Sequence, residues 1–462
     1  MPLRPIFVLL LEESTLQALM PGLPPKLVLS HDRCLLHVGH EALRHGYRVV
    51  LGSVVGSLRG QELTEVAQIY PTWSVQNRWL RLADTRDAEA VLSVQFGALH
   101  VRHLFHRAKI VGISPAAHFV EDLSMCGGPT YIEDMRAALR DNLDYIVVQN
   151  VRMQDVCSVF FEMLAGWKHN NRVLVAPFGF VPEEQAPSFD RQAVRNRMGL
   201  APDDIAIINA GGVWKWTDFN TFLRAFVKVV RTGDSRLKLF IMGLRQRQNP
   251  DHSDYIKETE GILERNGDLL DRRIICMRDW DEASACIQAY TAGADLGLNV
   301  NKDTLENWQS QRVRLVNYAE RGLGVINTVG DYASTSDMAK AMFLVQPECE
   351  ESYVGVLKKI SSNPDLVCHK RAAMRDIRCG MASVRTTGPL VEAIAAGTLL
   401  PRRATRAATM RRRGTAAVGK AIGMIQRGLE THPAGRKIAM RLRASLLLRN
   451  VLSRLGVVAA VK

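Results

Sequence analysis

Short apolar segments alternate with longer segments of helical periodicity along the first 400 residues, and no other feature constrains the fold as strongly. Short segments that are apolar nearly throughout are typical of strands buried on both faces, as in a parallel sheet covered by helices. In residues 1–180 we expect such strands at Ile6–Leu11, Tyr47–Leu51, Ala90–Val94, Lys109–Ile113, Tyr145–Val148 and Arg172–Ala176. A helix is expected at His31–His45, where Gly46 ends it before the next strand.

A second series of the same kind follows the segment 177–200, whose Pro, Glu and Gln content marks a linker. Expected strands are Ala206–Ala210, Leu237–Met242, Arg273–Met277, Leu296–Val300 and Gly324–Asn327, and expected helices are Asp218–Arg231, Glu282–Ala292 and Gln311–Glu320. Two such series without an internal repeat predict an α/β protein with two doubly wound, Rossmann-like domains. We expect them at residues 1–180 and 181–400, with a helical return segment at 383–400 and a ligand cleft between the domains.

The positive charge of the chain is confined to its last 62 residues. Residues 401–462 contain 15 Lys and Arg and one acidic residue, Glu430, whereas residues 1–400 contain 45 basic and 46 acidic residues. A neutral body with a strongly basic tail indicates two separate functions, one for each part.

The tail has the pattern of a basic amphipathic helix. Apolar residues such as Ile438, Leu442 and Leu446 recur at helical spacing, with arginines such as Arg441 and Arg449 between them. This pattern favours the plane of an anionic membrane, where each cation near the surface contributes ~1 kcal/mol before screening. The alternative is that the apolar stripe packs on the body and the arginines are solvated. Nucleic acid is the least favoured partner, because the tail has no aromatic residue for base stacking.

Cysteine usage and hydropathy favour the cytoplasm. The eight cysteines are scattered without a CxxC pair, which is not typical of a zinc site or a disulfide scaffold. The apolar run Ile6–Leu11 is too short for a bilayer span or a signal-peptide core. We therefore expect a cytoplasmic protein that is peripheral on the inner face of the cell membrane.

A Gly-Gly turn lies between an expected strand and the helix that starts near Asp218. Gly211 and Gly212 allow a close approach of the backbone to a ligand, and the following helix N-terminus attracts anions such as a diphosphate. Most such turns are merely tight connections between a strand and a helix. Because the turn is not a GxGxxG motif, it does not indicate a nicotinamide dinucleotide.

Two further groups of residues could contact a nucleotide. Arg312 and Arg314 stand at the start of the expected helix that ends at Glu320, where guanidinium groups could bind phosphate oxygens. On spacing alone, solvated residues at a helix start are the simpler interpretation. Trp280 follows a strand and could lie beside a base, although a buried tryptophan that anchors the loop is at least as common.

Four segments, taken together, resemble a known family. They are Tyr145–Asp155, Val175–Gly179, Gly211-Gly212-Val213-Trp214-Lys215-Trp216-Thr217-Asp218 with Leu223–Phe226, and Leu305–Tyr318 with Gly322–Ile326 and Thr328–Asp331. In order and spacing they are similar to the family-4 retaining glycosyltransferases of the GT-B fold, in particular to a branch with a Gly-Gly-x-Trp-x-Trp-x-Asp loop. The resemblance covers roughly residues 30 to 400.

The resemblance implies transfer of a hexose from a nucleotide-diphosphate donor to a hydroxyl acceptor, with retention at the anomeric carbon. The second domain would bind the donor, and the acceptor would be lipid-linked or a small molecule for a surface polysaccharide or glycolipid. It implies no cofactor and no metal, because cations and helix N-termini stabilise the leaving diphosphate. Consistently, the sequence has no suitable DxD pair and no His/Cys ligand cluster. The implied catalytic residues are His118, Lys215 and Arg312, and the implied donor-binding residues are Gly211, Gly212, Trp214, Arg245, Trp280, Gln309, Arg314 and Asn317.

The chain departs from the family at several positions. Two glutamates that many members carry eight positions apart correspond here to the amides Gln309 and Asn317. The Arg and Lys of the usual diphosphate loop correspond to Gly212 and Thr217, so Lys215 would take their place. An amide can still bind a ribose hydroxyl, but without the assistance of a charge.

The first domain would contribute His118, because related enzymes often place a histidine near the donor sugar at this point. A lone histidine after a strand is as often structural. Glu121 and Asp122 are the next candidates, and Ser30, His31, Asp32 and Arg33 could line an acceptor loop.

Two alternatives remain open. The uncharged Gln309 and Asn317 would suit a catalytically degenerate GT-B protein that binds a nucleotide or a partner. A sugar-nucleotide epimerase of the same fold is less favoured, because such enzymes require further carboxylates around the sugar that this sequence does not offer.

Overall fold

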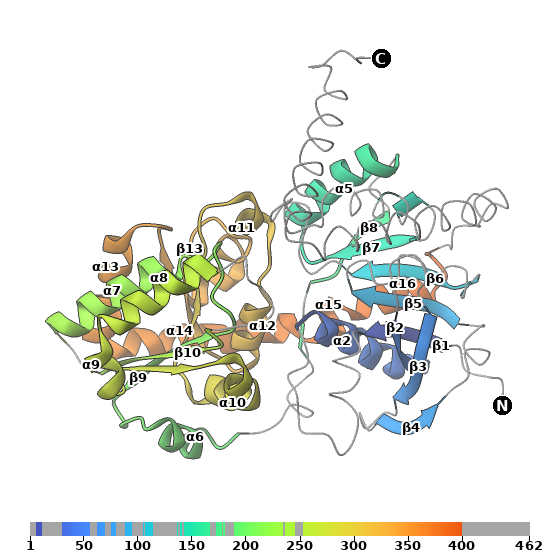
Figure 1. The fold of residues 1–462 in the computed structure, drawn as a ribbon. Helices are drawn as coiled ribbons and strands as arrows, with labels where there is room; N and C mark the ends of the chain where they lie inside the picture. Colours follow the sequence, from blue (N-terminus) through green and yellow to red (C-terminus); the bar gives the residue numbers. More distant parts are fainter. Residues whose placement is uncertain are drawn as a thin grey trace, which may run out of the picture.

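The computed structural model describes residues 6–11, 30–55, 62–69, 75–79, 88–94, 105, 107–113, 136, 139–140, 143–166, 172–177, 179–180, 189–233, 236–244 and 253–399. These residues form two lobes, each built on its own sheet (Figure 1). None of the helices within these ranges is long and apolar enough to cross a membrane. The tail at 401–462 lies outside the described residues, as do His118, Glu121, Asp122 and Arg245.

The first sheet has eight strands in the order β4-β3-β2-β1-β5-β6-β7-β8. Its parallel part consists of β1 (Ile6–Leu11), β2 (Arg48–Val55), β5 (Ala88–Val94), β6 (Lys109–Ile113), β7 (Tyr145–Val148) and β8 (Val173–Val175). All six correspond to strands predicted from their apolar runs. The helix α2 (Ser30–Arg44) follows β1 as expected, and Gly46 after it has a φ of +83°, a conformation that favours glycine.

An antiparallel hairpin at the edge of this sheet was not predicted. It consists of β3 (Glu62–Ile69), which pairs with β2, and β4 (Val75–Trp79). Both strands mix charged, amide and apolar residues. A strand at a sheet edge need not be apolar on both faces, so a search for continuous apolar runs misses it.

The return segment crosses back to the first domain and completes its core. The helices α15 (Ser383–Thr386) and α16 (Gly388–Ala395) follow a short parallel bridge between Phe180 and Ala382, where the two interdomain connections meet. Leu390, Val391 and Ile394 pack in the same core cluster as Phe7 and Leu9 of β1. The end of the described chain is therefore fixed to the lobe in which the chain begins.

The second sheet has six strands, all parallel, in the order β11-β10-β9-β12-β13-β14. They are β9 (Ile205–Ala210), β10 (Leu237–Met242), β11 (Ile275–Arg278), β12 (Leu296–Asn299), β13 (Gly324–Thr328) and β14 (Met342–Val345). The helices of this lobe include α7 (Phe219–Thr232), α8 (Ser253–Glu264), α9 (Gly267–Asp271), α10 (Trp280–Gly293), α11 (Leu305–Gln309), α12 (Val313–Glu320), α13 (Glu350–Ser362) and α14 (Pro364–Arg378). Strand β14 and helices α8, α9, α11, α13 and α14 were not predicted.

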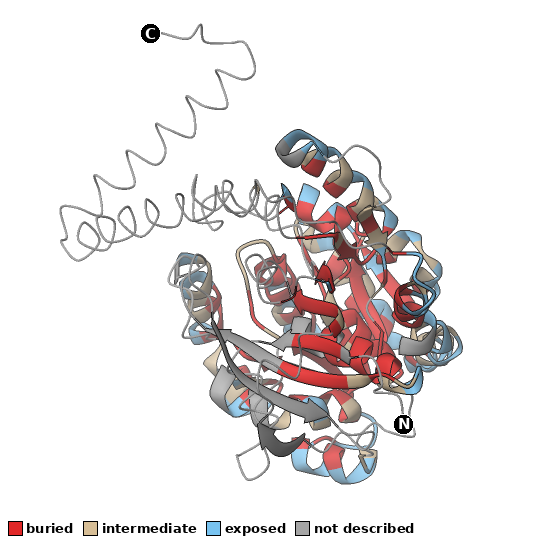
Figure 2. Ribbon diagram, turned by 90° about the vertical axis from the view of Figure 1, so that its right-hand side faces the viewer, coloured by how far each residue is buried: buried red, intermediate tan, exposed pale blue. Residues whose placement is uncertain are grey.

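Helices cover both faces of the second sheet, which explains its continuously apolar strands. In β9, Ile205 and Ile207 belong to the core shared with α7 and α13, whereas Ala206 and Ile208 belong to the core shared with α10 and α12. Buried strands run through the interior, and exposed residues lie on the outer sides of the helices (Figure 2). The predicted fold of two doubly wound α/β domains is confirmed.

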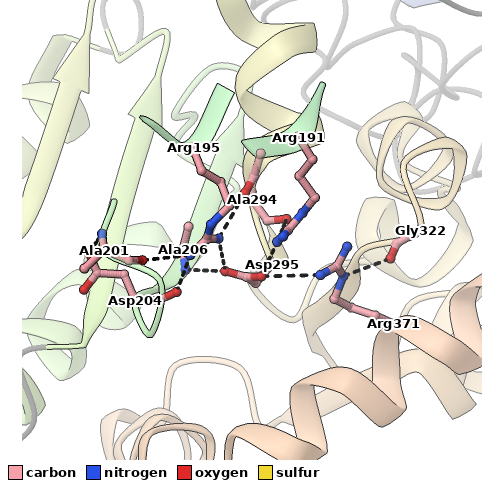
Figure 3. Close-up of polar contacts among 10 residues, drawn as sticks. Arg191, Arg195, Ala201, Asp204, Ala206, Ala294, Asp295, Gly322 and Arg371 are labelled. Carbon is pink, nitrogen blue, oxygen red and sulfur yellow. Dashed lines mark hydrogen bonds and ion pairs between the residues drawn. The ribbon is translucent and has the colours of Figure 1, made fainter. Parts of the chain in front are cut away.

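Asp295, just before β12, joins three elements of the second lobe (Figure 3). Its carboxylate is bonded at 2.5 Å by Arg191 and at 2.9 Å by Arg195, both on the linker helix α6 (Arg191–Met198). Arg371 of α14 approaches the same carboxylate at 3.4 Å. Asp295 also accepts from the main-chain N–H of Ala206 at 2.9 Å, so this cluster attaches the linker helix to the end of the sheet opposite the carboxyl ends of its strands.

Candidate functional site

The order of strands in the second sheet locates its candidate binding site. The chain leaves β9 toward β10 on one side, and β12 and β13 lie on the other side. The carboxyl ends of β9 and β12 therefore flank the point where the strand order reverses, which is where doubly wound sheets bind ligands. Two segments start there, the turn 211–218 after β9 and the segment 300–312 after β12.

Main-chain contacts hold these two segments side by side. The N–H of Lys302 donates to the carbonyl of Trp216 at 3.0 Å, and the N–H of Asp218 donates to the carbonyl of Val300 at 3.2 Å. Thr217 and Asn301 form an antiparallel bridge between them. The predicted donor loop and the start of the segment that carries Gln309 are thus held next to each other.

Arg314 lies against the Gly-Gly turn. Its guanidinium donates to Oδ1 of Asn209 at 3.0 Å and to the carbonyl of Gly212 at 3.3 Å. Gly211 has a φ of +139°, and a Cβ at that position would be 3.8 Å from Nη2 of Arg314. Burial lowers the pKa of the Arg314 guanidinium from its usual value, and the positive charge of Arg312 adds to this effect. A partly buried cation beside a glycine turn is suited to phosphate oxygens, because partial removal from water strengthens their attraction.

Arg312 is engaged differently, although it is only two residues away. Its guanidinium forms a two-point contact with the carboxylate of Glu306, at 2.5 Å and 2.6 Å. Glu306 is buried, and Arg312 is the residue that directly precedes α12. The structure therefore brings Arg314, rather than Arg312, to the Gly-Gly turn, and a catalytic role of Arg312 stays a prediction.

Tyr318 connects the two strands that flank the site, a role that sequence reasoning missed. Its buried hydroxyl accepts from the N–H of Ala210 at 3.0 Å and lies 3.1 Å from the carbonyls of Ile208 and Leu298. The ring lies over Gly297 of β12, where a Cβ would come within 2.3 Å of it. The only signal in the sequence is a tyrosine on the apolar side of the helix α12.

Buried side-chain amides accumulate in the segment after β12. Gln309 is 1% exposed, and within the described chain neither its Oε1 nor its Nε2 has a hydrogen-bond partner. The same part of the structure leaves one amide atom each of Asn301, Asn307 and Gln311 without a hydrogen bond. An unpaired buried polar group costs about 1–3 kcal/mol. Such a concentration at the edge of the site indicates groups that a ligand would satisfy.

The first domain contacts this segment directly. Asn150 precedes α5 (Val151–Ala165), and its Nδ2 donates to the carbonyl of Gln309 at 2.8 Å. Arg152 donates to the carbonyl of Trp308 at 2.9 Å, and its guanidinium lies 5.0 Å from the centre of the Trp308 ring. The two lobes therefore meet at the segment where the unpaired amides lie.

The remaining predicted residues of the second domain lie in the turn, on α12 and at the start of α10. The rings of Trp214 and Trp216 stack with their centres 5.1 Å apart. Lys215, the residue between them in the sequence, is partly buried. Asn317 lies one turn after Arg314 on α12 and is also partly buried. Trp280 is the first residue of α10, and its side chain lies outside the described atoms.

Asp218, the last residue of the Gly-Gly-x-Trp-x-Trp-x-Asp pattern, accepts hydrogen bonds that stabilise the fold. Its Oδ2 accepts from the hydroxyl of Tyr353 at 2.7 Å and from the N–H of Glu348 at 2.6 Å. Burial, followed by the charge of Asp218, raises the pKa of the Tyr353 hydroxyl. Asp218 therefore joins the start of α7 to the start of α13 and sets where the turn ends.

Part of the predicted site lies outside the described residues. His118 and Arg245 lie outside the described residues, and only the backbone of Ser30, His31, Asp32 and Arg33 is described, at the start of α2. Within the described ranges, no three His, Cys, Asp or Glu side chains are grouped to hold a metal ion. Transfer without a metal stays a prediction.

No protein-family model matches the chain, and no curated protein sequence matches it.

Comparisons of structure identify the fold. Sucrose-phosphate synthase from Thermosynechococcus elongatus has a TM-score of 0.57 and 12% identity, over 86% of this chain and 99% of that one. HepE from Anabaena, solved with UDP and glucose, has a TM-score of 0.57 and 12% identity, over 85% and 100%. WaaG, described as a glycosyltransferase involved in lipopolysaccharide biosynthesis, has a TM-score of 0.54 and 12% identity, over 85% and 100%. The chain has the GT-B architecture of these proteins, which confirms the predicted fold class.

Proposed function

We propose that this chain is a glycosyltransferase that moves a hexose from a nucleotide-diphosphate donor to a hydroxyl acceptor, with retention and without a metal. One observation carries the proposal. At the switch point of the second sheet, a partly buried arginine lies on a Gly-Gly turn, and unpaired buried amides line the adjacent segment. The first group suits a diphosphate, and the second suits the hydroxyls of a sugar.

The chemistry follows from where charge develops. When the bond from the anomeric carbon to the diphosphate breaks, negative charge accumulates on the departing phosphate oxygen. Arg314 and the N-terminus of α7 would stabilise this charge, because they are fixed before the reaction starts. Lys215 would supply further positive charge from the same turn, and Arg312 at the start of α12 would add to it where the donor draws its guanidinium away from Glu306.

The ligands of one structural neighbour suggest the first donor to test. HepE has been solved with UDP and glucose. A uridine diphosphate hexose is therefore our first candidate donor, with GDP and dTDP hexoses as the next.

The acceptor is proposed to be a lipid-linked or small-molecule hydroxyl for a surface polysaccharide or glycolipid. The support is the basic amphipathic pattern of residues 401–462, which suits an anionic membrane surface. Under this proposal the chain works in the cytoplasm, peripheral on the inner face of the membrane. Sedimentation with anionic liposomes should require residues 402–462, and equal sedimentation of the full chain and the truncated chain would contradict this part.

A donor panel tests the central proposal. UDP, GDP and dTDP hexoses are each incubated with the full chain, and thermal stabilisation and release of nucleoside diphosphate are measured. We expect one nucleotide to stabilise the protein and its hexose conjugate to be hydrolysed slowly. If no donor gives stabilisation or turnover, the proposal fails.

A second candidate function rests on Gln309 and Asn317, two uncharged amides where many members of the resembled family carry glutamates. A degenerate GT-B protein would bind the nucleotide or a partner without turnover. Turnover that is lost in Arg314→Ala excludes this candidate, whereas nucleotide binding without any turnover on the full panel favours it.

A further inference from the structure

The first turn of α5 contacts two separate segments of the opposite domain. Arg152 donates to the carbonyls of Trp308 at 2.9 Å and Gly330 at 3.0 Å, and to Oγ1 of Thr335 at 2.8 Å. Its guanidinium also lies 5.0 Å from the centre of the Trp308 ring. Three hydrogen bonds and a ring contact from one arginine bring together segments that follow β12 and β13.

Asn150 adds a contact of a different kind. Its Oδ1 accepts from the N–H of Met153 at 3.0 Å and caps α5, while its Nδ2 donates to the carbonyl of Gln309 at 2.8 Å. Asn150 is 1% exposed, so this bond is shielded from water. One side chain therefore fixes both the helix of the first domain and the backbone of Gln309.

Gln309, whose carbonyl accepts the bond from Asn150, also has a side chain without hydrogen bonds in the described structure. Gln309 is buried, and in the described structure its carboxamide has no hydrogen-bond partner at either atom. By contrast, the contacts of Arg314 with Asn209 and Gly212 lie entirely within the second domain. In the proposed donor site, Gln309 is thus held by a contact with the first domain, whereas Arg314 is held by contacts within the second domain alone.

We propose that Asn150 and Arg152 are positioning residues: they hold the first domain against the segment 304–312, and orient the Gln309 carboxamide toward the transferred sugar of the donor. This inference rests on the proposed function for the identity of the ligand. It predicts that recognition of the sugar requires the contact between the domains, whereas recognition of the diphosphate does not.

Three variants and a control separate this role from folding. Asn150→Asp keeps the cap of α5, because a carboxylate accepts from the Met153 N–H equally well, but it replaces the donor that faces the Gln309 carbonyl with an acceptor. Arg152→Ala removes the second contact, and Arg152→Lys keeps the charge but loses the fork of donors. Asp155→Ala, at an exposed position on the same helix, is the matched control.

The first measurement needs no nucleotide. In the full chain, amide hydrogen exchange of residues 304–312 and 328–335 should be about tenfold faster in Asn150→Asp and Arg152→Ala, with Arg152→Lys between them and wild type. Exchange in β9 and β10 and in Asp155→Ala should stay as in wild type. Unchanged exchange in both segments, or an equal increase across the whole chain, would overturn the positioning role, whatever the donor is.

The second measurement is a comparison of affinities. The dissociation constant for the nucleoside diphosphate should change by less than about twofold in Asn150→Asp, whereas that for the intact nucleotide sugar should rise about tenfold. Equal weakening of both ligands would overturn the assignment to the sugar. If wild type binds no nucleotide, the proposed function fails, and the exchange measurement still decides whether the contact holds the segment.

Discussion

Nη2 of Arg314 lies 3.3 Å from the carbonyl oxygen of Gly212, so a cation from α12 closes over the turn that follows β9. The same guanidinium donates to the side chain of Asn209 at 3.0 Å. The turn, the helix and the end of the strand therefore form a single unit, whose charge is positive before any ligand binds.

The fork geometry of Arg314 leads to the first prediction. Arg314→Lys keeps the positive charge, but a lysine cannot donate to Asn209 and Gly212 in the same geometry and still reach a phosphate. We expect the affinity for nucleoside diphosphate to fall by about 10- to 100-fold, as measured by titration calorimetry. Arg231→Lys, the same change on the exposed side of α7, is the control and should leave the affinity unaltered. An unchanged affinity in Arg314→Lys would exclude Arg314 from the diphosphate site.

The contact between Gly297 and Tyr318 leads to a prediction about stability. In Gly297→Ala the new methyl group would lie 2.3 Å from the Tyr318 ring, which the bonds of its hydroxyl to Ala210 and Leu298 hold in place. We expect the free energy of unfolding in urea to fall by about 1–3 kcal/mol.

A second glycine provides a control of opposite sign. Gly355 is an exposed residue of α13, and a Cβ there meets nothing within 4 Å. Gly355→Ala should therefore raise the free energy of unfolding by about 0.5–1 kcal/mol, because alanine favours the helix. Loss of stability in both variants would show that glycine is needed for a reason other than the Tyr318 ring.

Most strands of the two sheets could be predicted because they are buried on both faces. Strands such as Leu237–Met242 and Lys109–Ile113 are apolar and buried nearly throughout, and helices pack against both faces of the sheet that contains Leu237–Met242. The hairpin β3–β4 could not be found in this way, because strands at a sheet edge keep polar side chains. Fold class thus follows from burial, and the missed strands are those for which burial is least required.

The contacts within the site were harder to predict from the sequence, because they depend on the direction in which each side chain points. Arg312 and Arg314 are equivalent by spacing, but a step of two residues near a helix start turns their side chains to different sides, one toward Glu306 and the other toward Gly212. Arg152 contacts Gly330 across 178 positions of sequence, a pairing that no local pattern reveals. The residue types at the site could be predicted, but not their partners.

His40 gives a prediction about pH. It is buried on α2, and burial lowers the pKa of its imidazole below the ordinary value of 6.5, with Glu41 partly opposing this effect. A lowered pKa means that the unfolded chain takes up a proton at a higher pH than the folded chain does, so the stability contributed by neutral His40 is present above pH 6.5 and is lost as the pH falls through the folded pKa.

The variant His40→Gln does not titrate and should lose this contribution to the pH dependence. In urea unfolding between pH 7.5 and pH 5, we expect the free energy of unfolding of wild type to fall, relative to that of His40→Gln, once the pH drops below 6.5. Two curves that stay parallel over this range would show that the neutral state of His40 contributes nothing to stability.

The unsatisfied amide of Gln309 leads to a prediction in which stability and binding change in opposite directions. Gln309→Met replaces the buried carboxamide with an apolar group of similar length, and so removes two polar atoms that have no hydrogen-bond partner in the described structure. Replacing unpaired buried polar atoms with apolar ones should raise the free energy of unfolding of the ligand-free protein by about 1 kcal/mol. The affinity for the nucleotide sugar should fall about tenfold, because the sugar hydroxyls lose the donor and the acceptor that they would otherwise meet. Gln192→Met, at an exposed position on α6, should change neither quantity. If Gln309→Met is less stable than wild type and binds the nucleotide sugar equally well, the carboxamide serves the fold and the sugar is recognised elsewhere.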